Sequence, residues 1–294
     1  MFTSLHTHTV FSDGKDDIET MCAAAYDQGL CAIGFRCHAP MENAGRLTDW
    51  DGNMKADRLE AYINEVHAAR QRWEGKIAVF LGLEIDYIRG LRSALDLDIV
   101  NAHLDYCIGS VHYLVPPHGA PFTIDGPLAH LEKGITEGYT GDSEAMVNAY
   151  WDAVAEMIAL GGFDIVGHLD LIKKNNTSGK FFDAESTSYM RLIEEIARQI
   201  SAAGLVAEVN TGGINRGYIT ETYPSLSILR VLRQYDIKVM ISADAHNARD
   251  LSGNYQTAVQ TLLKAGYTSH VIFEGRINGK PVWKEISLGQ NDPH

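Results

Sequence analysis

The sequence has little cysteine, no cluster of basic residues and no long apolar segment. Its four cysteines, Cys22, Cys31, Cys37 and Cys107, form no Cys-x-x-Cys pair and follow no secretory signal. They predict reduced side chains in a cytoplasmic protein, without a disulfide framework. No apolar stretch approaches the roughly 18 residues of a membrane span, so we expect no membrane partner.

Basic residues are also outnumbered by acidic ones. The 38 acidic and 25 basic side chains leave a net charge of −13, and no run of lysine or arginine interrupts it. Such a chain repels a phosphate backbone, which disfavours nucleic acid as a partner. No residue pattern specifies an oligomeric state.

The chain does contain a regular alternation of short β-rich runs and longer segments of helical period. With 45% hydrophobic residues it can bury a sizeable core. The alternation predicts a parallel α/β fold. The predicted strands are 2–6, 31–35, 77–85, 105–111, 164–167, 205–209, 238–242 and 269–273. The predicted helices are 18–28, 56–73, 143–159, 186–203, 225–234 and 256–265.

One segment interrupts this alternation. Residues 116–141 are rich in proline and glycine and show no clean period, which predicts a long loop, either a binding loop or lid or a surface insertion. Residues 275–288 predict a terminal hairpin around Asn278-Gly279. We find no linker, so residues 1–294 are expected to form one domain.

Histidine is the most informative residue type, because several histidines and carboxylates stand where predicted strands end. His6 and His8 lie two residues apart in the first strand, so alternation places both side chains on one side. A single His-x-His pair is weak support for metal binding, but the pattern recurs on later strands. The other residues at strand ends are His38, Glu84, His112, His168, Asp244 and His246.

These side chains are predicted to meet at one face, because the carboxyl ends of parallel barrel strands form the face where active sites are built. A buried cluster of this kind is costly as packing alone, whereas bound cations would offset its charge. Imidazole and carboxylate ligands suit zinc, manganese or iron. Cys37, beside His38, is expected to be a buried small apolar residue and not a ligand.

Asp13 lies in a turn after the first strand, where it either ligates a metal or serves the turn. The six remaining histidines are expected to be exposed or structural, and His118 alone among them is a candidate for substrate contact. They are His67, His103, His118, His130, His270 and His294.

These motifs together resemble the polymerase and histidinol phosphatase (PHP) superfamily, and within it the histidinol-phosphatases. The similarity covers nearly the whole chain. The motifs are His6-Thr-His-Thr with Ser12-Asp-Gly, Gly34-Phe-x-x-His-Ala-Pro, Gly82-Leu-Glu, Gly109-Ser-Val-His, Gly167-His-Leu-Asp, Glu208-x-Asn-Thr and Ser242-Ala-Asp-Ala-His.

The resemblance implies a distorted TIM-like (β/α)7 barrel with up to three divalent ions. It assigns His6, His8, Glu84 and Asp244 to a first ion, and Glu84 with His112 and His168 to a second. It assigns Asp13, His38 and His246 to a third. Seven strands also imply that one of the eight predicted strands is peripheral. Arg36 and Cys37 depart from the Thr/Ser-Asp/Glu pair that often precedes the histidine in relatives.

The implied activity is hydrolysis of L-histidinol phosphate in histidine biosynthesis. Clustered divalent ions suit phosphate-ester hydrolysis because they orient phosphoryl oxygens, neutralise charge and lower the pKa of bound water. Glu84, Asp244 and Arg216 are the expected catalytic residues, and Arg216 resembles the family's phosphate-binding arginine.

The other candidate substrate contacts are less specific. Lys173 resembles a second cationic position or is a solvated lysine at a helix start. Asp125 is a candidate contact for the amino-imidazole cation of the substrate or is an ordinary surface acid, and His118 lies in the same long segment.

Other functions fit the same metal ligands. The alternative enzyme is a PHP-type metallohydrolase that acts on a nucleotide, an oligonucleotide end or an amide, because one scaffold hosts different reactions. A non-catalytic metal-binding protein is the third hypothesis, and the full ligand set argues against it.

Overall fold

Seven parallel strands form a nearly closed barrel in the structure, a computed structural model that describes residues 1–41 and 52–289. The strand order is β1-β2-β3-β4-β7-β8-β9. His8 N donates to Ala245 O at 2.8 Å, which joins the first strand to the segment after the last. The strands are β1 (Thr3–Thr7), β2 (Ala32–Phe35), β3 (Ala78–Asp86), β4 (Tyr106–Ser110), β7 (Ile165–Val166), β8 (Val206–Asn210) and β9 (Val239–Ser242).

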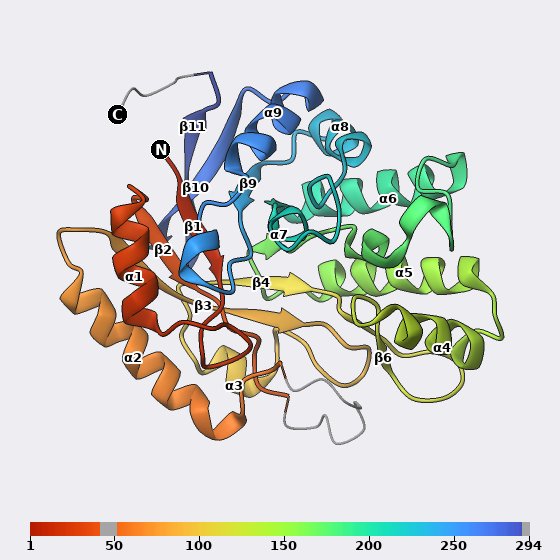
Figure 1. The fold of residues 1–294 in the computed structure, drawn as a ribbon, viewed down its shortest axis with the longest axis horizontal. Coiled ribbons are helices and arrows are strands. Elements are labelled where there is room, and N and C mark those ends of the chain that lie inside the picture. The colour runs from red at the N-terminus through yellow and green to blue at the C-terminus, as the bar shows by residue number, and fades with distance from the viewer. Residues whose placement is uncertain (42–51, 290–294) are drawn as a thin grey trace.

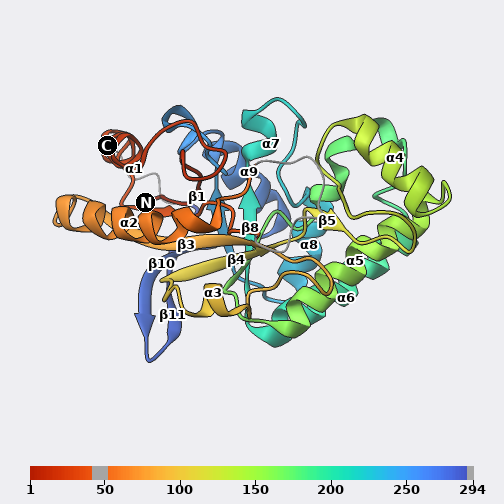
Figure 2. The same cartoon turned by 90° about the horizontal axis from the view of Figure 1, so that it is seen from below.

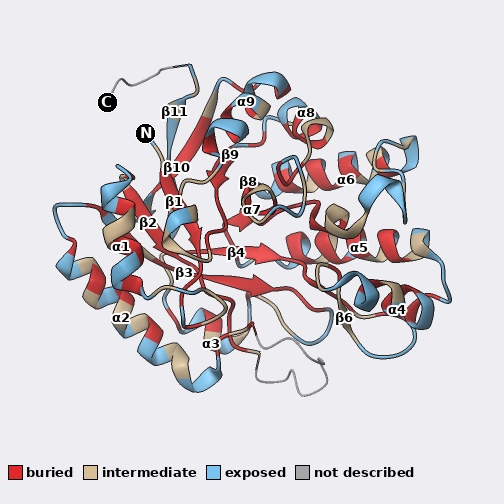
Figure 3. Ribbon diagram, viewed as in Figure 1, coloured by how far each residue is buried: buried red, intermediate tan, exposed pale blue. Residues whose placement is uncertain are grey.

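The (β/α)7 barrel implied by the resemblance is therefore confirmed, and the predicted strands differ from the observed ones by a few residues at their ends. Every residue of β1, β2, β4, β7, β8 and β9 is buried, as Figure 3 shows for the centre of the molecule. Strands covered on both faces explain why apolar runs, and not strict alternation, mark them in the sequence.

The helices surround the strands (Figure 1). Ser186 caps α6 through its hydroxyl and Gly204 ends it with a left-handed backbone, so both ends follow ordinary capping chemistry. No helix in the described ranges has the length and apolar character to cross a bilayer. The helices are α1 (Ile18–Asp27), α2 (Leu59–Arg72), α3 (Leu97–Val100), α4 (Leu128–Gly138), α5 (Ser143–Leu160), α6 (Thr187–Ala203), α7 (Gly212–Asn215), α8 (Leu226–Gln234) and α9 (Tyr255–Ala265). The described residues also contain the 3-10 turns η1 (Ala56–Arg58), η2 (Leu171–Asn175), η3 (Thr177–Gly179) and η4 (Ala248–Asp250).

The prediction of a loop over residues 116–141 was wrong for much of its length. The segment contains β6 (Phe122–Thr123), which pairs with β5 (Tyr113–Leu114), and then the 11-residue helix α4. Glycines in the buried stripe of α4 concealed its period. A Cβ at Gly134 would lie 2.4 Å from the Phe122 ring, so the helix can pack on β6 only without a side chain there.

The predicted terminal hairpin is present as β10 (Ser269–Ile277) and β11 (Lys280–Ser287), which pair antiparallel outside the barrel sheet. The eighth predicted strand is thus peripheral, as the resemblance implied. The hairpin projects from the molecule in Figure 2. Its Val271 and Phe273 pack against inward residues of the barrel strands, including Leu5 and Tyr106.

Candidate metal centre

The carboxyl ends of the barrel strands open into a pocket of about 400 Å³. Seven of the nine predicted metal ligands line it, and the other two, His6 and His8, are fully buried beside them. The seven are Asp13, His38, Glu84, His112, His168, Asp244 and His246. Residues spread over more than 240 positions of the sequence are therefore brought to one place by the barrel.

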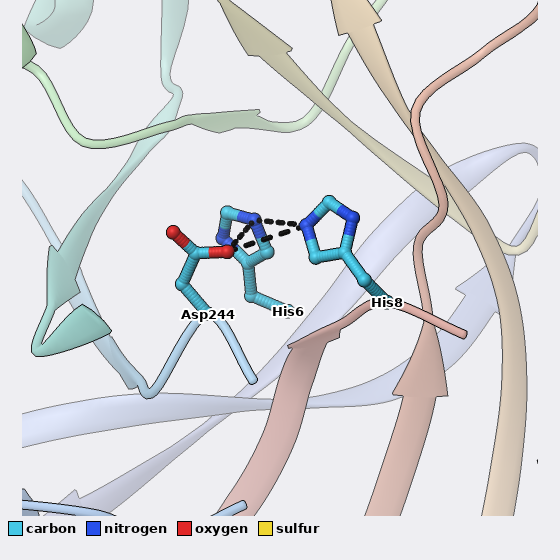
Figure 4. Close-up of side chains that lie close together, drawn as sticks. All are labelled: His6, His8 and Asp244. Carbon is cyan, nitrogen blue, oxygen red and sulfur yellow. Dashed lines mark hydrogen bonds and ion pairs between the residues drawn. The ribbon is translucent and has the colours of Figure 1, made fainter. Parts of the chain in front are cut away.

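His6, His8, Glu84 and Asp244 form the most compact group. His6 Nε2 lies 3.2 Å from His8 Nε2, and Asp244 Oδ1 lies 3.0 and 3.2 Å from these two nitrogens (Figure 4). Glu84 Oε2 lies 3.5 and 3.4 Å from the same nitrogens. Ligand atoms of a tetrahedral zinc ion, with bonds of about 2.0–2.1 Å, are about 3.3 Å apart. These separations fit four ligands of one ion.

A second group shares Glu84 through its other oxygen. His168 Nε2 lies 3.1 Å from both Glu84 Oε1 and His112 Nε2, and His112 Nε2 is 3.7 Å from Glu84 Oε1. All three side chains are buried. The two oxygens of Glu84 thus face two different groups of imidazoles, which is the arrangement of a bridging carboxylate.

Asp13 and His246 form a third group at the more open side of the pocket. Asp13 Oδ2 lies 3.0 Å from His246 Nε2 and 3.9 Å from His38 Nε2, while Asp13 Oδ1 lies 3.1 Å from His8 Nδ1. The Asp13 carboxylate therefore points into the histidine cluster, besides its place in the turn after the first strand. The other nitrogen of His38 faces Glu84 at 3.4 Å and Asp86 at 3.5 Å.

Asp86 was missed by the sequence analysis. Its Oδ1 is 2.5 Å from His112 Nδ1, and with His38 it forms a further set of potential ligands. The signal was present, because Asp86 stands two residues after Glu84 in one strand and so shares its face.

Glu208, the first residue of the Glu208-x-Asn-Thr motif, is a second functional residue that the sequence did not single out. It is fully buried in β8, and its Oε1 accepts hydrogen bonds from His6 Nδ1 and, at 2.7 Å, from Ser242 Oγ. Its Oε2 accepts from the backbone N–H of His168 at 2.7 Å. Glu208 thereby orients His6 so that Nε2 faces the pocket, the usual role of a carboxylate behind a ligating histidine.

Burial and neighbouring charges shift the pKa values of several histidines in the site. Burial lowers the pKa of His38 and His112, but Glu84 and Asp13 beside His38, and Asp86 and Glu84 beside His112, raise them to about 10 and about 9. Burial, with the nearby Arg36, lowers the pKa of His6 to about 4. His6 is thus neutral at physiological pH, the form that binds metals.

Arg216, just after α7, lines this pocket. Its Nη2 donates to Asp244 Oδ2 at 2.9 Å, and its Nη1 donates to Asp244 O at 2.8 Å and His246 Nδ1 at 3.0 Å. A Cβ at Gly212 would lie 2.9 Å from Arg216 Nη2. Glycine at this position leaves room for the guanidinium against the pocket.

The predicted substrate contacts lie in different places. Asp125 lines the pocket, but Lys173 does not: it pairs with Asp170 at 2.9 Å and Glu221 at 3.1 Å. The next residue, Lys174, lines the pocket instead. The 3-10 turn that holds both lysines decides which one faces inward, and sequence spacing does not reveal this.

The two histidines of the 116–141 segment lie at neighbouring hollows. His118 lines a hollow between β6 and α4, and His130, which is exposed as expected, lines both this hollow and the metal pocket. His270 is buried and structural, and His294 lies outside the described residues. Cys37 is fully buried with its Sγ 3.2 Å from Thr9 Oγ1, consistent with the expected packing role.

The chain belongs to the PHP family: the PHP domain model matches residues 4–212. Two curated relatives carry a more particular name. The chain is 30% identical over 243 residues to a Deinococcus radiodurans protein named "Probable histidinol-phosphatase", covering 83% of this chain and 85% of that protein. It is 27% identical over 268 residues to the histidinol-phosphatase of Bacillus subtilis, covering 87% of this chain and 97% of that protein.

Solved structures share the fold. A Listeria monocytogenes protein matches with a TM-score of 0.78 at 24% identity, covering 87% of this chain and 99% of that one. A second match is the histidinol phosphate phosphatase of Lactococcus lactis, which was solved with zinc, L-histidinol and phosphate. It has a TM-score of 0.64 at 20% identity, and the match covers 92% of this chain and 95% of that one. Both confirm the barrel architecture.

Proposed function

We propose that this protein is a metal-dependent L-histidinol-phosphate phosphatase of histidine biosynthesis, acting in the cytoplasm on a small phosphate ester. The observation that carries the proposal is the cluster of nine histidine and carboxylate side chains, seven lining one pocket and two buried beside it, with Arg216 at the pocket wall. The histidinol-phosphatase names of relatives that align over more than four fifths of the chain support the choice of substrate.

One domain, residues 1–294, performs this function in our proposal. The PHP match ends at residue 212, yet Arg216, Asp244 and His246 lie beyond it and line the same pocket as Glu84. The chain after residue 212 therefore supplies part of the site.

We assign the metal ligands as the motifs suggest. His6, His8, Glu84 and Asp244 hold one ion, Glu84, His112 and His168 hold a second, and Asp13, His38 and His246 hold a third. Zinc, manganese and iron all suit this mixture of imidazole and carboxylate. When bound, such ions neutralise phosphoryl charge and lower the pKa of bound water toward neutrality.

Three residues of the chain have catalytic roles in this assignment. Arg216 binds the phosphoryl group, for which its planar guanidinium offers paired donors. Asp244 fixes Arg216 through Oδ2 while its Oδ1 faces His6 and His8. Glu84 keeps the two imidazole groups at a fixed spacing because each of its oxygens faces one of them.

The alcohol part of the substrate faces the wall made by the β6–α4 segment and η2. Asp125 lies there with Lys174, whose Nζ donates to Asp125 O at 2.6 Å and lies 3.5 Å from Asp125 Oδ2. We assign Asp125 as the contact for the cationic amino-imidazole part of the substrate. We assign Lys174, in place of Lys173, as the second cationic side chain near the phosphate. His118 lines the adjoining hollow, and we assign its place at the metal pocket to His130, which lines both.

The test is phosphate release by the metal-reconstituted protein from L-histidinol phosphate beside a panel of nucleotides and sugar phosphates. We expect kcat/KM for histidinol phosphate to exceed the others by several orders of magnitude. Equal rates across the panel would move the substrate to another phosphoester, and no release from any ester would favour amide hydrolysis or a non-catalytic role.

Replacement of Arg216 tests the phosphate site separately. Arg216→Ala should lower kcat/KM by about a hundredfold or more, since a charged hydrogen-bond donor to the reacting group is lost. Arg216→Lys keeps the charge without the paired donors, so its kcat/KM should lie between those of the unsubstituted protein and Arg216→Ala. Unchanged kcat/KM in Arg216→Ala would refute the assignment.

A further inference from the structure

Arg36 is a fully buried arginine inside the barrel, directly beneath the metal centre. It follows β2, where its backbone N–H donates to Thr7 O at 2.8 Å. His38 stands two residues later and Glu84 forms a β-bridge with it, so Arg36 and His38 project to the same side of one extended segment. Neither the ligand set nor the proposed reaction uses this residue.

The guanidinium of Arg36 lacks ordinary hydrogen-bond partners. Within the described ranges, no acceptor lies within hydrogen-bond geometry of its Nε, Nη1 or Nη2. Its nearest opposite charge is Glu84 Oε2, 3.5 Å from Nη2. A buried charge with five donors and no hydrogen bond is costly unless it has a compensating electrostatic role.

That role follows from the surroundings of Glu84. Its Oε2 is met at 3.4–3.5 Å by nitrogens of His6, His8, His38 and Arg36. Imidazoles gain or lose a proton, whereas a guanidinium stays charged at every physiological pH. Arg36 is thus the permanent positive charge against the carboxylate that the first two proposed ion positions share.

We propose that Arg36 is a resident counter-ion of the metal centre. In the metal-free protein it offsets the negative charge of Glu84 and so keeps the empty ligand cluster assembled. Because it cannot leave when ions bind, it also opposes them electrostatically, and it therefore stabilises the metal-free state more than the loaded state. This inference rests on the metal site of the proposed function and not on its substrate.

The experiment compares Arg36→Met, which removes the charge and keeps an unbranched chain, with Arg36→Lys, which keeps the charge. Melting temperatures are measured for protein treated with EDTA and for protein loaded with Zn²⁺. Zn²⁺ affinity is measured by competition with a chromophoric chelator. No phosphoester is used, so failure of the substrate panel leaves this test intact.

We expect Arg36→Met to lower the melting temperature more in EDTA than with Zn²⁺. Since a residue that favours the empty state opposes binding by the same free energy, Zn²⁺ should bind about fivefold or more tightly to this variant. Arg36→Lys should retain an affinity near that of the unsubstituted protein.

Arg276→Met is the matched control, because Arg276 belongs to strand β10 of the hairpin, where it pairs with Asp164 at 2.5 Å, away from the metal pocket. It should lower both melting temperatures equally and leave Zn²⁺ affinity unchanged. The same result in Arg36→Met would reduce Arg36 to a packing residue and overturn the proposal. Weaker Zn²⁺ binding in Arg36→Met would also overturn it, because Arg36 would then hold Glu84 in its metal-binding orientation.

Poor folding of Arg36→Met is informative as well. Refolding that succeeds only with Zn²⁺ present is an expected result, since the added cation replaces the missing one. If Arg36→Met and Arg36→Gln both fail to fold with and without Zn²⁺, the residue serves the fold in either state and the proposal is wrong.

Discussion

The two ends of the barrel are built on opposite principles. At the carboxyl ends of the strands, histidines and carboxylates such as His6, Glu84 and Asp244 are buried together. At the other end the strands are closed by apolar side chains, with Phe273 of the hairpin packed against Tyr106, Phe80 and Trp283 at ring distances of 5.4, 5.0 and 5.4 Å.

This difference separates the sources of stability and function. The apolar end gains free energy from removal of surface from water, which needs no partner. The polar end contains buried charges whose balance depends on protons, on Arg36 and on bound cations. We therefore expect substitutions at one end to change stability alone, and substitutions at the other to change metal binding.

Glu84→Gln should have the largest effect at the metal-binding end, because it removes the negative charge that the two imidazole groups share. We expect metal content to fall and turnover to drop by about a thousandfold, because the ligand and its charge-neutralising ions are lost together. Elemental analysis and phosphate release measure the two effects. Normal metal content with normal turnover would exclude Glu84 as a bridging ligand.

Phe273→Ala tests the other end. Removal of a buried aromatic ring should lower the free energy of unfolding by about 3–5 kcal/mol. Bound metal per folded chain should stay as in the unsubstituted protein. Denaturant unfolding with elemental analysis checks both, and a loss of metal in the folded variant would show that the two ends are coupled.

Glu208→Gln tests the carboxylate behind His6, because it removes the negative charge and keeps the shape of the side chain that orients His6. Loss of the carboxylate behind a ligating histidine typically weakens metal binding about 10–100-fold. Chelator competition measures the change. Ser242→Ala, which removes another donor to Glu208 Oε1, is a milder companion and should shift affinity in the same direction.

The smallest effect should be a pH dependence confined to the metal-free protein. His38 and His112 have pKa values of about 10 and about 9, above the usual 6.5, so their stabilisation is complete below about pH 6.5 and is lost as pH rises through about 9 to 10. Ions must displace these protons, so metal affinity should rise with pH over the same range.

Melting curves in EDTA and with Zn²⁺, at pH values from about 6.5 to about 10, test this expectation. The melting temperature in EDTA should decline toward high pH while the gain from Zn²⁺ increases. A pH-independent gain would mean that the two imidazoles carry no proton in the empty site.

Much of the fold and of the candidate site was accessible from the sequence because both depend on local rules. Apolar runs ended by His38, Glu84 or His168 mark barrel strands and their functional ends together. Helix α4 was not accessible, since Gly134 and Gly138 occupy its buried face and read as breakers. Glycine is required at these two helical positions because Phe122 packs against Gly134 and Pro116 packs against Gly138, which leaves no room for a side chain.

The residue pattern predicted a parallel α/β fold and most of the polar side chains at the carboxyl ends of its strands, because residues two apart in a strand share a face. The seven-stranded barrel followed from the resemblance of the motifs to the PHP family. The contacts between distant residues became visible only in three dimensions. Asp86 lies against His112, Glu208 lies behind His6, Lys174 and not Lys173 lines the pocket, and Arg36 lies beneath Glu84. These contacts join distant segments or depend on a single turn's direction, and no local pattern encodes the distance between such atoms.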